Sequence, residues 1–539
     1  MKKHYRHLVA ILIAVFCGLV GWWIGRDLEK TIVRQPRTKQ VDRPKPAPAP
    51  RGYSRPPVRD EFRDGTTVEI FASRNEDQVI LRFPSAESYG SFILALNRSK
   101  VELVDQIDRL RAVRLGYDQW ADLAEMLEGE NINTYDSLPS VPAPTPSGGN
   151  AQQGLVAFGN GLLPWLGITG DNSRWGAGVK IAVLDSGVVA HPALPGLKRS
   201  IEITPFPADL SKTHGHGTAV ASLIASNDPA APGVAPAAEI ISVRVSDESG
   251  RADSFELAAG ILAAIDAGAQ LINISMGTTE NNPLIEEAVL YAHDRNVLIV
   301  AASGNSEQAD ACYPAAYPSV ISVGAVDARG EHLDFSNYGT YLSLTAPGYA
   351  VNAAWPGNRY AAISGTSASA PIVTGAIAAT MSDGRGVTMS ASQAAEIVMD
   401  RSDEAGIPGP DSEYGFGILN MARVMNRSVA GIVDAAITHH RIFKSGSLTG
   451  GDEIQITIQN RGTVLLVNTL LEVNTSFGSR QFNAGMLAPG AIQTFSLPVR
   501  LQGVPQNQPV QVQSSLTLGT PGRDATPENN LRSEVLYVR

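Results

Sequence analysis

Three side chains that could support nucleophilic catalysis stand at the ends of short motifs in this 539-residue chain. Asp185 closes an apolar, β-branched run, which places it at the C-terminal end of a predicted strand. His216 begins a predicted helix, and Ser367 begins another, between Gly365 and Pro371, a proline that only a first helical turn tolerates. A serine nucleophile needs a base to take its proton and a carboxylate to orient that base. The three motifs together therefore predict acyl transfer by a serine.

Each motif alone also has an ordinary structural explanation. Asp185 could cap a helix, His216 could be a hydrogen-bonded turn histidine, and small-residue turns such as that at Ser367 often precede alanine-rich helices. His214, two residues before His216, is a rival for the base. The helix start and the following Gly-Thr favour His216, so we expect His214 to shape the preceding loop.

In this order of Asp, His and Ser, the chain resembles the subtilisin-like serine proteases over about residues 155–428. The motifs that carry the resemblance are Leu184-Asp185-Ser186-Gly187, His216-Gly217-Thr218, Ile274-Ser275-Met276-Gly277, Ala302-Ser303-Gly304-Asn305, Tyr317-Pro318-Ser319-Val320 and the segment around Ser367. The resemblance implies an Asp185–His216–Ser367 triad, with the Asn305 side chain in the oxyanion hole. A different class of function, an inactive binding scaffold of the same fold in the cell envelope, is the alternative.

The resemblance also implies where a peptide substrate would bind. Ser275, Met276 and Gly277 would pair with the substrate backbone as an added strand, and Ser249 and Gly250 would form the opposite edge.

Two features near this expected cleft have competing interpretations. Cys312, just before Tyr313-Pro314, would lie at the base of the specificity pocket and leave it small or medium-sized, or it is simply a buried free cysteine. Asp247 and Glu248 could favour basic substrate side chains, or they are a solvated acidic pair.

The composition limits cofactors and partners. A formal net charge of −10 with 18% charged residues gives no case for nucleic-acid binding. The two cysteines, Cys17 and Cys312, provide no disulfide framework. No cofactor is expected, and no metal ligand is carried over, because residues 222–232 depart from the family's calcium-loop pattern. A structural calcium with unknown ligands stays open, and Asn227 and Asp228 are unsupported candidates.

The N-terminus predicts attachment to a membrane. Residues 1–7 form a basic cytoplasmic head, and residues 8–25 an uncharged run that we interpret as a transmembrane signal anchor, with a cleaved signal peptide as the alternative. Residues 26–59 are a proline-rich linker with ten Lys or Arg against three Asp or Glu. We therefore expect a single-pass protein of the bacterial cell membrane whose catalytic domain is extracytoplasmic, periplasmic or extracellular.

Residues 60–140 are predicted to be a small α+β unit of β-α-β-β-α-β order. The expected strands are 78–83, 100–105, 110–115 and 131–135, and the expected helices are 86–97 and 117–128. Its order and position resemble the inhibitory prosegments of subtilisins, although an independent adhesion or docking module is the competing interpretation. We expect residues 131–142 to occupy the cleft as an extended strand, with cleavage between about 135 and 154, where 141–154 form an exposed linker.

The catalytic region, residues 155–428, alternates apolar runs with helical periods and predicts an α/β fold with a parallel sheet covered on both faces. The expected strands are 179–184, 239–245, 271–275, 297–302 and 319–325, with helices at 216–226, 254–268, 284–295 and 368–381. Residues 429–539 show period-two runs at 453–459, 464–473, 494–500 and 510–518, which predict a β-sandwich. Its turns resemble bacterial adhesion-type immunoglobulin-like domains, so an envelope partner is a possible ligand.

Overall fold

A computed structural model describes residues 67–140, 155–209, 213–309, 311–382, 387–443, 452–500 and 508–538. The predicted head, anchor (8–25), basic linker (26–59) and second linker (141–154) all lie outside these residues. Within the described ranges, no helix combines the length and the apolar character that a membrane crossing requires.

A seven-stranded parallel sheet forms the centre of the catalytic region, in the order β12-β11-β10-β9-β6-β8-β7. The strands are β6 Lys180–Asp185, β7 Leu197–Glu202, β8 Glu239–Arg244, β9 Leu271–Ile274, β10 Leu298–Ala302, β11 Val320–Val326 and β12 Leu344–Pro347. The five predicted strands are confirmed. The two edge strands, β7 and β12, were not predicted, because β7 is largely exposed and carries polar residues, and β12 has only four residues.

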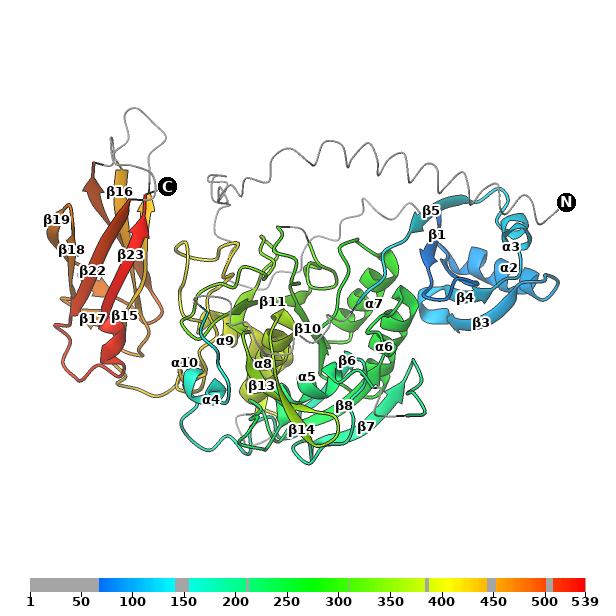
Figure 1. Ribbon diagram of the computed structural model, residues 1–539, viewed down its shortest axis with the longest axis horizontal. Helices are drawn as coiled ribbons and strands as arrows, with labels where there is room; N and C mark the ends of the chain where they lie inside the picture. The colour runs from blue at the N-terminus through cyan, green and yellow to red at the C-terminus, as the bar shows by residue number, and fades with distance from the viewer. Residues whose placement is uncertain are drawn as a thin grey trace. The chain divides into compact units, whose positions relative to one another are not determined.

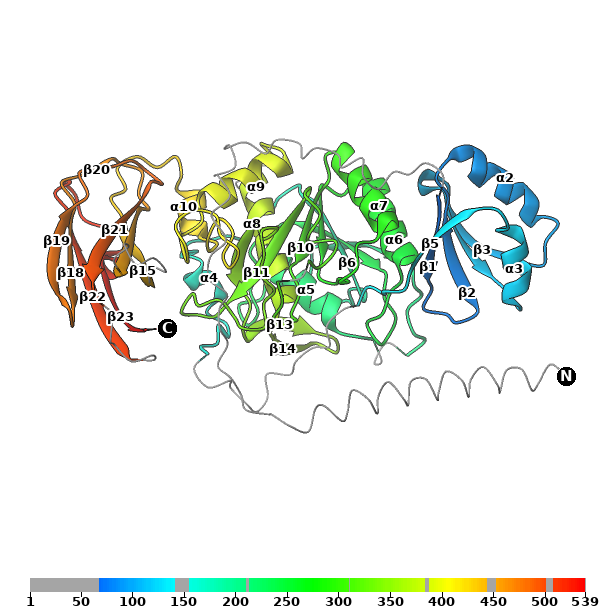
Figure 2. The same cartoon turned by 90° about the horizontal axis from the view of Figure 1, so that it is seen from above.

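Helices cover both faces of this sheet (Figures 1 and 2). α5 His216–Ala225 and α8 Thr366–Ser382 pack in one hydrophobic core, and α6 Ser254–Asp266 and α7 Pro283–Asp294 pack in the other. All four predicted helices are confirmed. Every residue of α8 is buried, so this helix runs through the core, and its N-terminal end lies beside Ser275, which follows β9.

Smaller elements complete the catalytic region. They are the helices α4 Leu162–Trp165, α9 Ala391–Asp400 and α10 Met421–Met425, and the antiparallel hairpin of β13 Val351–Trp355 and β14 Arg359–Ile363.

The N-terminal unit is a five-stranded sheet in the order β3-β4-β2-β1-β5 with two helices. Its elements are β1 Thr67–Ala72, β2 Gln78–Arg82, α2 Ala86–Leu96, β3 Glu102–Ile107, the 3₁₀ turn η2 Asp108–Leu110, β4 Ala112–Gly116, α3 Trp120–Met126 and β5 Asn131–Tyr135. The predicted order was wrong at its start, because β1 precedes it and lies between β2 and β5. β1 is buried along four successive residues, so the alternation that would have revealed it is missing.

The C-terminal region is rich in β-structure. It contains a sheet of β15-β16-β21, a sheet of β19-β18-β22-β23 and the short pair β17-β20, and these share one hydrophobic core. The strands are β15 Ala435–Phe443, β16 Asp452–Asn460, β17 Leu466–Val467, β18 Leu470–Thr475, β19 Gly478–Asn483, β20 Met486–Leu487, β21 Ile492–Val499, β22 Pro509–Thr517 and β23 Leu531–Tyr537. The predicted runs 453–459, 494–500 and 510–518 are confirmed as strands, whereas 464–473 is divided between β17 and β18. The strands β15, β19, β20 and β23 were not predicted.

Candidate active site

Asp185 and His216 form a buried pair at the C-terminal end of β6. Nδ1 of His216 lies 3.0 Å from Oδ1 and 2.9 Å from Oδ2 of Asp185. The carboxylate is inaccessible to solvent, and His216 is 4% exposed at the first residue of α5. A carboxylate bound to Nδ1 fixes the imidazole tautomer and leaves Nε2 as the atom that exchanges protons.

Ser367 is the second residue of α8, whose first N–H groups have no partner within the helix. Its hydroxyl donates to the main-chain oxygen of Ser275 at 3.2 Å, and the Ser275 hydroxyl donates to the main-chain oxygen of Ser367 at 3.2 Å. Gly365, just before the helix, has φ 130°, a conformation open mainly to glycine. The chain thus turns sharply into α8 and presents Ser367 beside the segment that follows β9.

Asn305 follows β10 and lies against the turn into α8. Its Oδ1 accepts from the N–H of Thr366 at 2.9 Å and from the Thr366 hydroxyl at 3.0 Å. A Cβ at Gly365 would lie only 3.0 Å from Asn305 Nδ2, so this glycine makes room for the amide. With the oxygen held, the amide nitrogen is the end of Asn305 available to donate.

Ser186, named above only as part of a motif, and Arg244, not predicted at all, connect the segments that carry the acid and the base. The Ser186 hydroxyl donates to the His214 oxygen at 2.6 Å and accepts from the Gly217 N–H at 3.1 Å. The guanidinium of Arg244 donates to the Ser186 oxygen at 2.5 Å. Ser186, which follows Asp185, is thereby hydrogen-bonded to residues before and after His216, namely His214 and Gly217.

Arg244 is the last residue of β8, and its side chain has no solvent exposure. Beyond Ser186, it donates to the Pro205 oxygen at 3.1 Å and to Glu248 at 3.1 Å, and it stacks over Phe206 at 4.8 Å. Burial lowers the pKa of this arginine, with Glu248 acting in the opposite direction. An arginine at the end of the predicted strand 239–245, after Ile240, Ile241 and Val243, was the available sequence signal.

His214 does not take the place of His216 beside Asp185. Its ring lies 6.0 Å from that of His216, and its carbonyl accepts from Ser186. Burial, followed by the proximity of His216, lowers the pKa of His214, so this side chain is a neutral neighbour of the pair at neutral pH.

The residues expected to bind substrate lie on two edges, and the N-terminal unit reaches both. On the first edge, Ser140 and Gly277 exchange main-chain hydrogen bonds, with Ser140 N to Gly277 O at 3.1 Å and Gly277 N to Ser140 O at 3.2 Å. On the other edge, Ser140 bridges Arg251, and the Ala252 N–H donates to the Pro139 oxygen at 3.1 Å. An extended segment of the chain therefore lies between the edges as a third strand.

Ser249 and Gly250 lie in the turn that precedes this second edge. The Ser249 N–H and hydroxyl donate to Asp247 Oδ1 at 2.9 and 2.7 Å, and the Arg251 N–H donates to the same oxygen at 3.0 Å. Asp247 therefore shapes the edge from within, and Glu248 pairs with Arg244. Asp247 and Glu248 are therefore not a merely solvated acidic pair. The N-terminal unit contacts Arg251 and Ala252, through Ser140 and Pro139 respectively, rather than the predicted edge residues Ser249 and Gly250.

Cys312 lies between two of the motifs that the resemblance rests on. Its Sγ is the nearest atom to a Cβ built on Gly277, and its own Cβ would lie 3.3 Å from one built on Gly304. Met276, between Ser275 and Gly277, is buried. Burial raises the pKa of the Cys312 thiol to about 11, so it is a neutral thiol that fills space between the two glycine-bearing segments.

No group of three or more His, Cys, Asp or Glu side chains within the described ranges could hold a metal ion. Asp228, the weak calcium candidate beside Asn227, instead accepts from Tyr360 at 2.5 Å and from the Ala230 N–H at 2.9 Å.

Comparison with known proteins defines the class. The subtilase family model matches residues 176–417. A thermostable alkaline protease of Halalkalibacterium halodurans is 35% identical over 48% of this chain and 73% of its own length. Subtilisin BL of Lederbergia lenta is 40% identical over 38% and 76% of the two chains, and alkaline elastase YaB of a Bacillus species is 38% identical over 58% and 83%. The solved structure of the prenylagaramide maturation protease PagA is 30% identical, covering 47% of this chain and 95% of that one at a TM-score of 0.42.

These relatives are peptidases of one family, and the fold described above is the α/β sheet expected for it. The chain belongs to the subtilase family and is a serine endopeptidase.

Proposed function

We propose that this endopeptidase cuts peptide bonds with Asp185, His216 and Ser367. His216 removes the proton of the Ser367 hydroxyl through Nε2 while Asp185 holds Nδ1, and the Ser367 oxygen attacks the scissile carbonyl. His216 then gives the proton to the leaving amine. In the second half of the reaction His216 takes a proton from water, the water attacks the acyl-enzyme, and the proton passes to the Ser367 hydroxyl as the acid is released. The observation that carries this proposal is the contact between Asp185 and His216. Both carboxylate oxygens of Asp185 lie within 3.0 Å of Nδ1 of His216, and both residues are buried.

The negative oxygen formed during attack is stabilised by two donors. One is the main-chain N–H of Ser367, at the N-terminal end of α8, where the helix dipole adds favourable potential. The other is Nδ2 of Asn305, whose Oδ1 is held by Thr366.

The side chain taken by the specificity pocket is small to medium-sized. Cys312 places sulfur where the segments of Gly277 and Gly304 approach each other, which leaves less room than a glycine would. One of the relatives is named an elastase, and a preference for small residues at this position suits the same geometry.

The N-terminal unit inhibits the enzyme until one bond is cut. Its last described residues lie between the cleft edges, bonded to Gly277 and Ala252. This supports a prosegment over a docking module. Cleavage falls between about residues 135 and 154.

The remaining parts give the enzyme its place in the cell. Residues 8–25 anchor it in the bacterial membrane with the catalytic domain outside, and the β-rich C-terminal region is an immunoglobulin-like domain that binds an envelope component or acts as a spacer. Membrane fractionation of cells expressing the full chain and a chain lacking residues 8–25 tests the anchor. Equal recovery of both in the soluble fraction would contradict it.

Replacement of the nucleophile tests the catalytic proposal. Ser367→Ala removes one oxygen at a buried helix start, so the fold should persist while peptide hydrolysis is lost. Hydrolysis of a chromogenic peptide by the purified variant, with thermal unfolding as the control for folding, measures this. A folded Ser367→Ala chain with full activity would exclude Ser367, and a wild-type chain without activity would favour the inactive scaffold.

A further inference from the structure

The N-terminal unit touches the cleft through its main chain. Ser140 pairs with Gly277, and Pro139 accepts from Ala252, in each case through backbone atoms. Any extended segment can make such bonds. They explain why the cleft is blocked, but they do not explain what makes the protease hold this unit rather than another peptide.

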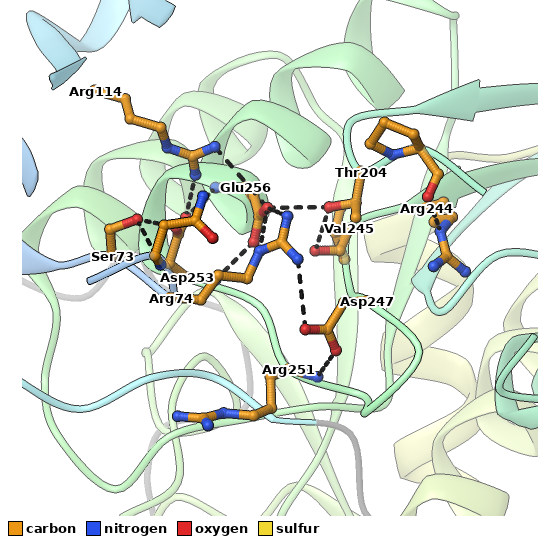
Figure 3. Close-up of polar contacts among 12 residues, drawn as sticks. Ser73, Arg74, Arg114, Thr204, Arg244, Val245, Asp247, Arg251, Asp253 and Glu256 are labelled. Atoms are coloured by element: carbon orange, nitrogen blue, oxygen red, sulfur yellow. Dashed lines mark hydrogen bonds and ion pairs between the residues drawn. The ribbon is translucent and has the colours of Figure 1, made fainter. Parts of the chain in front are cut away.

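A carboxylate centre at the start of α6 binds two arginines of the unit (Figure 3). Glu256 Oε1 lies 2.7 Å from Nη2 and 2.9 Å from Nε of Arg74. Asp253 Oδ1 accepts from Arg114 at 2.5 Å, and Asp253 Oδ2 accepts from the Ser73 hydroxyl at 3.2 Å. The side chains of Asp253 and Glu256 are 0% and 1% exposed, so this is a desolvated set of charges.

The positions of the two carboxylates are set by the protease itself. Asp253 caps α6 and accepts from the Glu256 N–H at 3.0 Å, while Glu256 accepts from the Asp253 N–H at 2.9 Å. Thr204 donates to Glu256 at 3.1 Å. This capping box directs the remaining carboxylate oxygens toward the unit.

A second centre lies on α7. Glu287 Oε2 accepts from Nε of Arg82 at 2.7 Å, and Oε1 accepts from Arg111 at 2.7 Å. Arg82 also pairs with Glu69 of its own unit, which orients it. Glu287 is 20% exposed, so this pair too is mostly shielded from water.

The apolar contacts between the unit and the protease are less specific for one partner than the ion pairs are. Phe71, Ile80, Leu110 and Ala112 of the unit share a hydrophobic cluster with residues of α6 and α7. Such burial gives affinity without fixing a partner, whereas opposite charges placed in register fix partner and orientation.

Arg74 also connects the α6 centre to the cleft. Its Nη1 lies 3.4 Å from Asp247, the carboxylate that holds the N–H groups of Ser249 and Arg251. Arg251 belongs to the edge that Ser140 bridges. Docking at α6 thus supports the edge in the geometry that receives an extended segment.

We propose that α6 and α7 form an arginine-docking surface that selects the enzyme's own N-terminal unit, with Asp253–Glu256 and Glu287 as its two recognition centres. This rests on the proposed inhibitory role of the unit and assigns its specificity to these ion pairs, while the cleft strand supplies blockage. After the linker is cut, the same pairs hold the unit as a separate chain.

Desolvation makes the pairs sensitive to the loss of one partner. Burial and then the charge of Asp253 raise the pKa of Glu256, and Arg114 and Arg74 oppose this rise. A buried carboxylate that loses its nearest arginine is costly, because the remaining arginine lies farther away, as Arg114 does at 3.9 Å from Glu256, and does not replace the lost contact in full.

Docking can be measured without any peptidase activity. The measurement uses a full-length variant with Ser367→Ala and a recognition sequence for an unrelated site-specific protease placed within residues 141–154. That protease then cuts the variant once, between the N-terminal unit and the catalytic region. The dissociation constant of the severed unit is then followed by dilution and by NaCl titration. Hydrolysis by the Ser367→Ala chain would contradict the proposed catalysis without affecting this measurement.

Variants on both sides of the interface separate specific pairing from bulk charge. Arg114→Met and Glu256→Gln should each weaken binding by about 30-fold or more, the effect expected when one partner of a buried charge pair is removed. Combined, Arg74→Met and Glu256→Gln should weaken it by less than the product of their single effects, because both remove one contact. Arg109→Met, which breaks an exposed pair with Asp266, should cost less than about fivefold.

Two matched controls remove a charge elsewhere. Arg98 on the unit and Glu396 on α9 are exposed and form no ion pair with the part of the chain that the structure describes. Arg98→Met and Glu396→Gln should change binding by less than about twofold. If Arg74→Met, Arg114→Met and Glu256→Gln all stay within about threefold of these controls, apolar burial and the cleft strand suffice and the proposal is wrong.

Discussion

At the residue scale, the space around Ser367 is set by glycine and by one amide. Gly365 could not carry a side chain without meeting Asn305, and Thr366 holds the Asn305 oxygen from two sides. Such an amide is oriented before any substrate arrives, which is the condition under which a hydrogen-bond donor lowers a barrier most. Catalysis at this site therefore depends on neighbours that never react.

Loss of the Asn305 amide should be costly but not complete. Asn305→Ala should lower kcat by about 10²–10³-fold with little change in KM, the magnitude typical of one oxyanion-hole donor, for which subtilisin itself is the standard example. Steady-state kinetics on a peptide substrate measure this. A decrease of less than about threefold would mean that Asn305 does not face the reacting carbonyl.

Arg244 is predicted to position the triad without touching the substrate. Arg244→Met removes the donors to Ser186, Pro205 and Glu248 and should lower kcat by about 10–100-fold, as small displacements of catalytic groups do. KM should change by less than about threefold. Arg244→Lys should recover part of the loss, since it keeps the charge but not the fork of donors.

The matched control is Arg423→Met, because Arg423 is also a buried arginine but lies on α10 and pairs with Asp403. It should lower the thermal midpoint while leaving kcat near wild type. Equal loss of kcat in both variants would reduce Arg244 to a stability role.

At this scale the sequence was informative wherever a residue type is demanded by chemistry. The pairing of Asp185 with His216 rather than His214 was predictable because the predicted helix begins at His216. Ser186 and Arg244 were not predictable, because their importance lies in contacts between segments far apart in the chain.

At the element scale, buried parallel strands were predictable because they are continuous apolar runs. β1 and β23 show two reasons why a strand can be missed when the sequence is searched for alternating apolar and polar residues. β1 is buried on consecutive residues, in contact with two different cores. In β23 the pattern is inverted: Leu531, Val535 and Tyr537 are exposed, while Glu534 contacts buried His440 and Arg532 donates to the Thr438 oxygen.

His439 of β15 predicts an acid-sensitive C-terminal region. Burial, with Arg532 acting in the same direction, lowers the pKa of His439 from its usual value of 6.5 to about 4. The unfolded chain therefore binds a proton near pH 6.5 that the folded chain refuses until about pH 4. Stability contributed by neutral His439 is present above pH 6.5 and is lost as the pH falls toward 4, by at most about 3 kcal/mol.

Hydrogen exchange of β15 and β16 between pH 7 and 4 measures this, with intrinsic exchange rates corrected for pH. Protection should fall in the wild-type chain and fall less in His439→Gln. The same slope in both chains would mean that His439 does not control the titration.

In the whole molecule, the catalytic region contacts both the N-terminal unit and the C-terminal region. Asp403 of the catalytic region pairs with Arg461, the residue after β16, at 3.1 Å, and Gln459 Oε1 accepts from the Glu404 N–H at 3.0 Å. The N-terminal unit reaches α6, α7 and both cleft edges. Changes of period along the sequence are the basis on which the order of domains was predicted. Which surfaces meet was not predictable, since the arginines and carboxylates that join them look like ordinary surface charge.

Processing of the chain follows from this arrangement. The active enzyme should separate into the N-terminal unit and a mature protease whose first residue lies between about 136 and 155, while Ser367→Ala should accumulate uncut. N-terminal sequencing of the purified protein locates the cut. Identical cutting in Ser367→Ala purified from a protease-deficient host would mean that another enzyme performs it.

Ser367 is proposed to be a serine made nucleophilic by His216 and Asp185. A fluorophosphonate probe reacts only with such an activated hydroxyl, so the processed enzyme should gain one probe mass, and peptide mapping should place it on Ser367. His216→Ala should take up no label while remaining folded, because the proton acceptor is gone. Absence of label from a processed, folded wild-type enzyme, or a label on any residue other than Ser367, would contradict the assignment of Ser367 as the nucleophile.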